Sequence, residues 1–200
     1  MTYVIDMKGL GESLDAAAER FTAAETSREN VIRSSREIIR SSKRILHSIH
    51  EGGLDEGEVD NISKLVKSLN VEIDMDAGLL RSGPATDALS EYAEAMILKD
   101  ILYSGSVPSF TDLGIDERSW VLGLADTVGE LRRIVLKNLM DGALEEAVSI
   151  FETMEDITDG ILMFDVPDAV VPIRRKQDIA RGIIERTRSD ITTAVVMSKK

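Results

Sequence analysis

Hydrophobic residues recur with the period of an α-helix along most of the chain, and no stretch of useful length alternates with the period of two that marks a β-strand. The clearest pattern ends at His50, where aliphatic residues share one side of a helix and basic residues occupy an arc of roughly 100° on the other. This pattern predicts one long helix from about Leu10 or Ser13 to His50, ended by Gly52 and Gly53.

Further helical segments follow, separated by short breaks that contain Gly, Pro or Ser. They cover about residues 55–80, 87–103, 116–141, 143–163 and 173–194. Residues 104–114 are expected to form a loop with room for a short turn, residues 164–172 a connection with two prolines, and Asp116 an N-cap. The sequence therefore predicts an all-α fold, a single elongated bundle of about six to seven helices over residues 1–200, with residues 1–9 as a loose end.

The segment 87–103 combines two carboxylates with an apolar surrounding. Glu91 and Glu94 point the same way as Leu98 and Ile101, and most of the remaining circumference is also apolar. A helix that is apolar nearly all round is normally buried, and buried carboxylates need a partner. A metal ion is one candidate for that partner.

A second acidic pair lies in the helix predicted for residues 116–141. Asp126 and Glu130 are spaced i,i+4 and so share a face, and Gly123 beside them leaves room for a close approach. Four carboxylates on two facing helices would form an all-oxygen site that suits Mg²⁺ or Mn²⁺, and no His lies at i+3 to complete a di-iron motif. An ordinary solvated face, in which Asp126 and Glu130 form ion pairs with Arg133 and Lys137, remains the alternative.

Composition narrows the class of protein further. The 200 residues include no Cys, which excludes disulfides and thiolate metal sites. The first residues lack the pattern of a signal peptide, and no apolar run approaches the 18 residues of a membrane span. We therefore expect a soluble, cytoplasmic protein without a membrane partner.

The net charge is −12, and a uniformly acidic surface would repel nucleic acid. The basic residues, however, are concentrated in two stretches. Residues 28–44 and 171–188 each contain six basic and two acidic residues. A plain solvated face is the alternative to a nucleic-acid interface. The candidate RNA-binding residues in these stretches are Arg33, Arg36, Arg40, Lys43, Arg44, Arg174, Arg175 and Lys176.

Three separated motifs resemble the translin family, and its TRAX branch in particular. VLGLADTVGELRR at residues 121–133 contains the pattern L-G-x-A-D-x-x-G-E-L of that branch. SREIIRSSKRILHSIH at residues 35–50 resembles the first long helix of the family, and SEYAEA at residues 90–95 resembles its E-Y-x-E-A segment. The similarity follows the order of the chain and is of the single-chain type found in prokaryotes and archaea.

The resemblance implies an all-α fold, assembly into a closed octameric shell, and Mg²⁺-dependent endoribonuclease activity on single-stranded RNA. By motif, Glu91, Glu94 and Asp126 correspond to catalytic residues, and Glu130 to an auxiliary ligand. One chain alone would have to form a homo-oligomer. Two alternatives stay open: a non-catalytic shell that binds RNA, and an all-α nucleotide pyrophosphohydrolase, for which the spacing of Asp126 and Glu130 is wrong.

Overall fold

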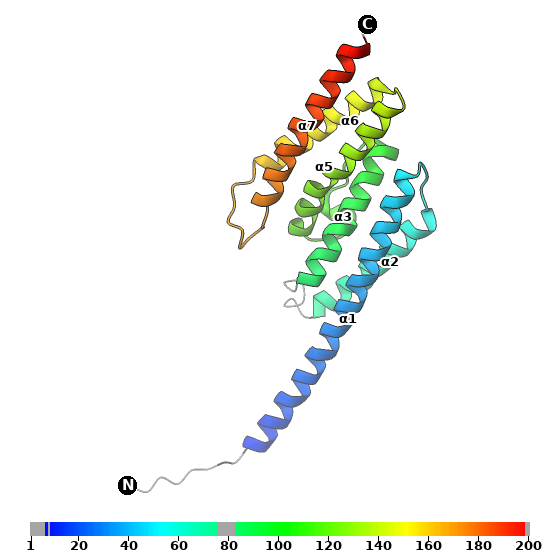
Figure 1. Cartoon of the computed structure of the whole chain (residues 1–200). Coiled ribbons are helices and arrows are strands. Elements are labelled where there is room, and N and C mark those ends of the chain that lie inside the picture. Colours follow the sequence, from blue (N-terminus) through cyan, green and yellow to red (C-terminus); the bar gives the residue numbers. More distant parts are fainter. Residues whose placement is uncertain (1–6, 8, 76–82, 199–200) are drawn as a thin grey trace.

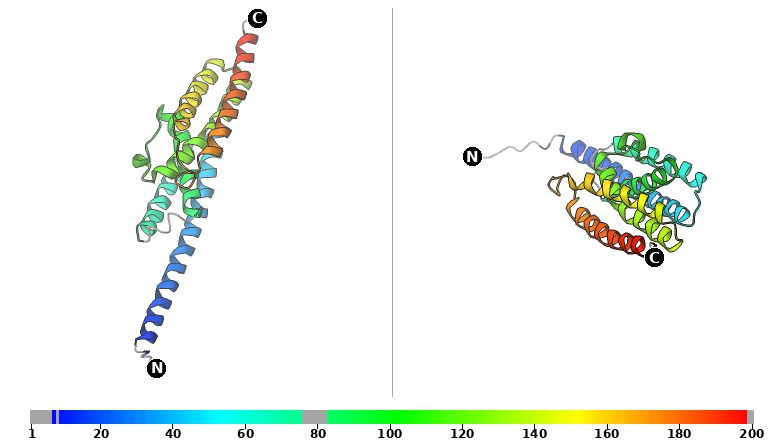
Figure 2. Two further views of the ribbon diagram at one scale, coloured as in Figure 1. Left: turned by 90° about the vertical axis from the view of Figure 1, so that its left-hand side faces the viewer. Right: turned by 90° about the horizontal axis from the view of Figure 1, so that it is seen from above.

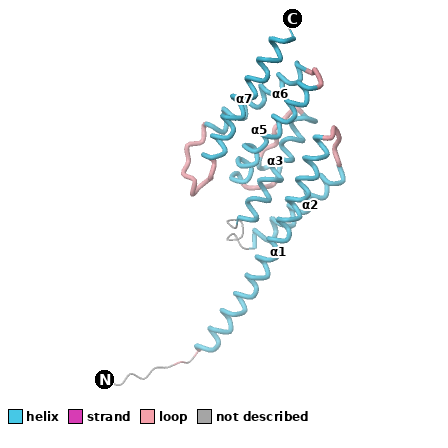
Figure 3. The backbone as a smooth tube through the Cα atoms, viewed as in Figure 1, coloured by secondary structure: helices cyan, strands magenta, loops and turns pink. Residues whose placement is uncertain are grey.

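The computed structural model describes residue 7, residues 9–75 and residues 83–198, and within these ranges it contains helices and loops but no strand (Figure 3). The predicted all-α fold is confirmed. The helices are α1 (Leu10–His50), α2 (Glu56–Met75), α3 (Gly83–Ser104), α4 (Phe110–Leu113), α5 (Glu117–Met140), α6 (Leu144–Leu162) and α7 (Arg174–Ser198).

The long helices run roughly alongside one another in an elongated bundle (Figures 1 and 2). Helix α3 packs between α1 and α5, while α2 covers α1, and α6 and α7 pack on α5 and on each other. The start of α1 and the end of α7 lie at opposite ends of the molecule (Figure 1). The central position of α3 explains its apolar circumference, because it meets neighbours on opposite sides.

Fully buried aliphatic side chains from several helices make up one core. Ile38 and Ile45 come from α1, Leu98 from α3, Leu131 from α5 and Ile161 from α6, and each has an exposed fraction of 0%. The buried face of α3 thus links the core on the α1 side to the core on the α5 side.

The ends of the helices follow local rules, with a few differences from the sequence prediction. Helix α3 begins at Gly83 rather than at residue 87, because a proline is tolerated in the first turn of a helix. In the predicted loop 104–114, Ser109 and Asp112 form a capping box that starts α4. Asp116 caps α5 as predicted, accepting from Ser119 N at 2.9 Å. Residues 76–80, predicted as the end of the second helix, lie outside the described residues.

The first half of α1 stands clear of the bundle (Figure 1, blue; Figure 2). Residues 10–30 are almost all exposed, and the buried face of the helix starts at Val31. From there to Ile49, α1 packs against α2 and α3. The long helix therefore has a projecting half and a packed half.

Candidate functional site

The contact between α3 and α5 is closest at Gly123. A Cβ atom at this position would lie 2.5 Å from Ala93 Cβ, 2.5 Å from Ser90 O and 2.9 Å from Glu94 N. Such distances are far shorter than the 3.5–4.0 Å of an ordinary contact. Only a glycine lets the two backbones approach this far, and the approach brings the acidic residues of both helices together.

Glu94 lies at the centre of this acidic group. Burial, together with the negative charges of Asp126, Glu91 and Glu130, raises the pKa of Glu94 to about 8. Burial also raises the pKa of Glu91, against the opposing effect of Lys43. The four carboxylates predicted from the sequence are thus close enough to repel one another when they are ionised.

Two of these carboxylates have cationic or hydrogen-bonding partners from distant parts of the chain. Lys176, at the start of α7, forms an ion pair with both carboxylate oxygens of Asp126. On Glu130, both His50 Nε2 and Arg133 Nη1 bind the same oxygen, Oε2, the arginine at 2.7 Å. The pairing of Glu130 with Arg133 is the one expected for an ordinary solvated face. The contacts of Lys176 with Asp126 and of His50 with Glu130 are not, because both partners come from other helices.

The His50 residue is itself fixed by α5. Lys137 Nζ donates to the backbone oxygen of His50 at 2.8 Å, at the point where α1 ends. A positive side chain is favourable at the negative end of a helix dipole. Lys137 and Glu130 therefore attach the end of α1 to α5 through the backbone and the side chain of one residue.

The donor set suits a hard divalent cation, because it contains only carboxylate oxygens. Within the described part of the chain, however, no three His, Asp or Glu side chains are placed so that they could hold one metal ion together. Asp126 and Glu130 are turned toward their protein partners instead. The residue types fit Mg²⁺ or Mn²⁺, and the side-chain positions are those of an ion-paired state.

A row of basic side chains leads along α1 toward the acidic group. Arg33, Arg36 and Arg40 are exposed and line a shallow depression of about 360 Å³ together with Glu29 and Ile32. Lys43 follows one turn later, close enough to Glu91 to oppose the rise that burial causes in the pKa of that carboxyl. The basic residues predicted on the first helix thus form a path that ends beside the acidic residues of α3.

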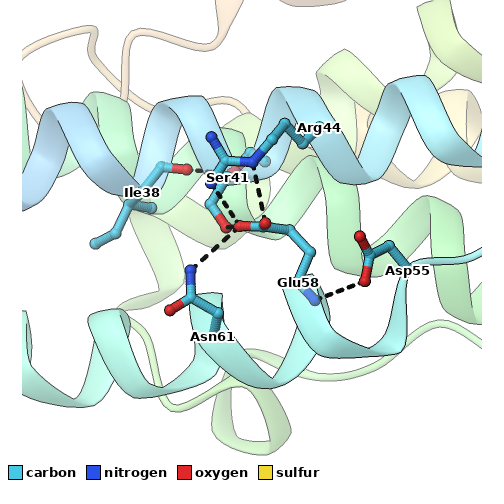
Figure 4. Close-up of polar contacts among 7 residues, drawn as sticks. Ile38, Ser41, Arg44, Asp55, Glu58 and Asn61 are labelled. Carbon is cyan, nitrogen blue, oxygen red and sulfur yellow. Dashed lines mark hydrogen bonds and ion pairs between the residues drawn. The ribbon is translucent and has the colours of Figure 1, made fainter.

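The other candidate RNA-binding residues differ in their surroundings. Arg174 and Arg175 are exposed at the start of α7, whereas Lys176 is engaged by Asp126. Arg44 forms two bonds to Glu58, of 3.0 and 2.7 Å, and Glu58 also accepts from Ser41 and Asn61 (Figure 4). Arg44 therefore joins α1 to α2, a role that its place in the basic stripe of the sequence did not suggest.

Sequence reasoning also missed His50 as a neighbour of the acidic group. Residues 50 and 130 are 80 positions apart, and helical spacing relates only residues of the same helix. The close approach at Gly123, in contrast, was predicted and is confirmed.

Comparisons with known proteins agree on one fold. No protein-family model matches the chain. The chain is 36% identical over 176 residues to an uncharacterised protein of Methanocaldococcus jannaschii, covering 86% of this chain and 78% of that protein. It is 32% identical over 130 residues to the translin-associated protein X homolog of Schizosaccharomyces pombe, covering 57% of this chain and 56% of the homolog.

Among solved structures, apo-NeC3PO matches with a TM-score of 0.81 at 22% identity, over 90% of this chain and 96% of that chain, and so supports the fold. AfC3PO matches with a TM-score of 0.73 at 30% identity, over 94% of this chain and 100% of that chain. A complex of AfC3PO with duplex RNA gives the same score and identity over 92% and 97%.

The bundle thus places the chain in the class of all-α proteins that share the C3PO fold. The chain belongs to the translin/TRAX-like family, as the three sequence motifs predicted. Over the described residues, no helix is both long and apolar enough to cross a membrane.

Proposed function

We propose that this chain is a metal-dependent endoribonuclease that cleaves single-stranded RNA inside a closed homo-oligomeric shell, in the family's case an octamer. The observation that carries the proposal is the convergence of Glu91, Glu94, Asp126 and Glu130 at the close contact of α3 and α5. Crowded carboxylates in a half-buried setting are costly without a cation, and such sites are typical of catalysis. The complex of AfC3PO with duplex RNA, at 30% identity, supports RNA as the ligand.

Glu91, Glu94, Asp126 and Glu130 would hold Mg²⁺ or Mn²⁺ through their carboxylate oxygens. Once bound, such an ion lowers the pKa of a water and neutralises negative charge on a phosphodiester. His50 and Arg133 both bind Oε2 of Glu130, and none of the described residues donates a hydrogen bond to the other oxygen of that carboxylate. That oxygen is the one available for a ligand.

Lys176 has a separate part in this site. Its ammonium group neutralises Asp126 in the present structure, so that Asp126 exchanges one positive partner for another when it binds a divalent cation. An ammonium freed from Asp126 remains beside the site, where it can pair with a phosphate oxygen. Lys176 would then serve as an RNA-binding residue, as the sequence predicted.

The basic path on α1 would guide the RNA. Arg33, Arg36, Arg40 and Lys43 present positive charge along one side of the helix and lead to Glu91. Contacts of this kind to phosphate groups position the strand without reading its sequence. A thin, flexible strand enters an enclosed site more readily than a stiff duplex, so single-stranded RNA is the proposed substrate.

The decisive experiment is an RNA cleavage assay with Mg²⁺ and with EDTA, run beside a nucleotide hydrolysis assay. Glu91→Gln, Glu94→Gln and Asp126→Asn should abolish cleavage in Mg²⁺ but preserve RNA binding. Glu145→Gln, which removes an exposed carboxylate from α6, is the matched control and should cleave like wild type. Cleavage that persists in EDTA, or in the three site variants when they are folded, would exclude the proposed metal site. Equal cleavage of a blunt duplex would argue against an enclosed site.

One observation favours a second function. Since no three of the described acidic or histidine side chains are grouped to hold a metal ion, a shell that binds RNA without cleaving it is the other candidate. RNA binding without cleavage in either Mg²⁺ or Mn²⁺ would identify this function. Hydrolysis of nucleotides, with RNA left intact, would instead identify a pyrophosphohydrolase.

A further inference from the structure

The projecting half of α1 has an apolar side with no cover. Leu10, Leu14 and Phe21 have exposed fractions of 44%, 60% and 74%, and none of them meets the core of the bundle. A single helix of about 20 residues is only marginally stable in water unless its apolar side is packed. The projecting half therefore calls for a partner.

The apolar side continues onto the packed half of the same helix. At 100° per residue, Leu10, Leu14 and Phe21 lie within an arc of about 40°, and Ile32 and Ile39 fall on the same line. Ile32 and Ile39 are only half-buried, since the core of the bundle lies on an adjacent side of α1. The apolar residues of the projecting and packed halves thus share one side of α1, and between Phe21 and Ile32 this stripe is interrupted by Glu25 and Arg28.

We propose that a second copy of the chain covers this stripe, and that the two α1 helices pair in antiparallel orientation. The inference rests on the homo-oligomer proposed above and assigns one of its contacts. Leu14 and Phe21 are seven residues apart, and so are Ile32 and Ile39. When Phe21 faces Ile32 of the second copy, Leu14 therefore faces its Ile39, and twofold symmetry repeats both contacts.

The two charged residues on the stripe agree with this orientation. Glu25 and Arg28 interrupt the apolar stripe between Phe21 and Ile32. In the antiparallel register that pairs Phe21 with Ile32, Glu25 faces Arg28 of the second copy, and twofold symmetry repeats this contact between opposite charges. A parallel pair in register would instead place Glu25 against Glu25 and Arg28 against Arg28, and like charges repel one another.

Cysteine cross-linking tests both the contact and its direction, because the native chain contains no Cys. Phe21→Cys combined with Ile32→Cys should give a reducible covalent dimer on mild oxidation. Two residues eleven positions apart on one helix are about 16 Å apart, too far for a disulfide within the chain. The matched control is Ala23→Cys combined with Asn30→Cys, which has the same register on the opposite side of α1 and should stay uncross-linked.

The outcomes separate the alternatives. A covalent dimer with Phe21→Cys alone would show parallel pairing and overturn the proposal, as would equal cross-linking by the control pair. If light scattering shows an oligomer but the Phe21 and Ile32 pair does not cross-link, the contact is wrong and the homo-oligomer stands. A wild-type chain that remains at 22.0 kDa would overturn both. As a second measurement, Phe21→Glu should lower the oligomer mass with an unchanged helical spectrum, whereas Ala23→Glu should leave the mass unchanged.

Discussion

Gly123→Ala should destabilise the protein, although alanine is the better helix former. The added Cβ would meet Ala93 Cβ, Ser90 O and Glu94 N at 2.5, 2.5 and 2.9 Å. Two of these atoms are backbone and the third is attached to it, so no side-chain rotation relieves the contact. Helices α3 and α5 must move apart by about 1 Å to reach an ordinary contact distance.

The magnitude follows from a comparison with a second glycine of α5. At Gly129 an added Cβ would meet only Ile183 Cδ1, at 4.0 Å, which is an ordinary contact. Replacing glycine by alanine in a helix gains about 1 kcal/mol at both positions. This gain cancels in the difference, which leaves the overpacking cost of about 1–3 kcal/mol at Gly123. Gly123→Ala should therefore be less stable than Gly129→Ala by that amount.

Urea unfolding followed by circular dichroism measures this difference directly, with wild type as reference. In thermal melts, a chain of this length should show a gap of about 2–4 °C for each kcal/mol. If Gly123→Ala proved as stable as Gly129→Ala, the helices would not be in the close contact on which the candidate site depends. RNA cleavage by Gly123→Ala, measured well below its melting temperature, should also fall, because Glu94 and Asp126 lie on the two helices that separate.

Three other predictions concern charge. The bonds from Arg44 and Ser41 lower the pKa of Glu58 to about 2, so this carboxylate stabilises the folded state above its unfolded pKa near 4.5 and loses that contribution as the pH falls toward 2. In urea unfolding, the free energy by which wild type exceeds Glu58→Gln should therefore shrink as the pH falls through this range and stay constant above about pH 6. The pKa of Glu94 is raised to about 8, so this residue favours the folded state below pH 4.5 and loses that contribution as the pH rises through 8. In EDTA, the free energy of unfolding of Glu94→Gln should therefore rise relative to that of wild type between about pH 5 and pH 9. A difference between the two proteins that does not change with pH would contradict the burial of this carboxyl. Replacing Arg36, Arg40 and Lys43 by Glu should weaken the binding of all RNA sequences alike. The slope of log affinity against log salt concentration should fall by roughly 0.7 for each lost phosphate contact, measured in samples with the oligomer mass of wild type. An unchanged slope would mean that these residues form only a solvated face.

Patterns within one helix were predictable from the sequence, and contacts between distant helices were not. The apolar circumference of α3 predicted its burial, and Asp116 predicted the start of α5, because both depend on neighbouring residues. The pairing of Lys176 with Asp126 depends on how α7 packs against α5, which no local pattern specifies. The capping box of α4 is a missed local signal, since Ser109 and Asp112 have the spacing of that motif.

The length and continuity of α1 have a mechanical consequence. From residue 12 to residue 50 the helix contains no Gly or Pro, which are the usual sites of hinges and kinks. Its projecting arm and its packed arm are each about 30 Å long, and they meet near Val31, where the buried face of α1 begins. At the other end of α1, the ring of His50 binds Glu130. Packing of the projecting arm against a second copy would therefore connect that subunit contact to the acidic residues through one uninterrupted helix.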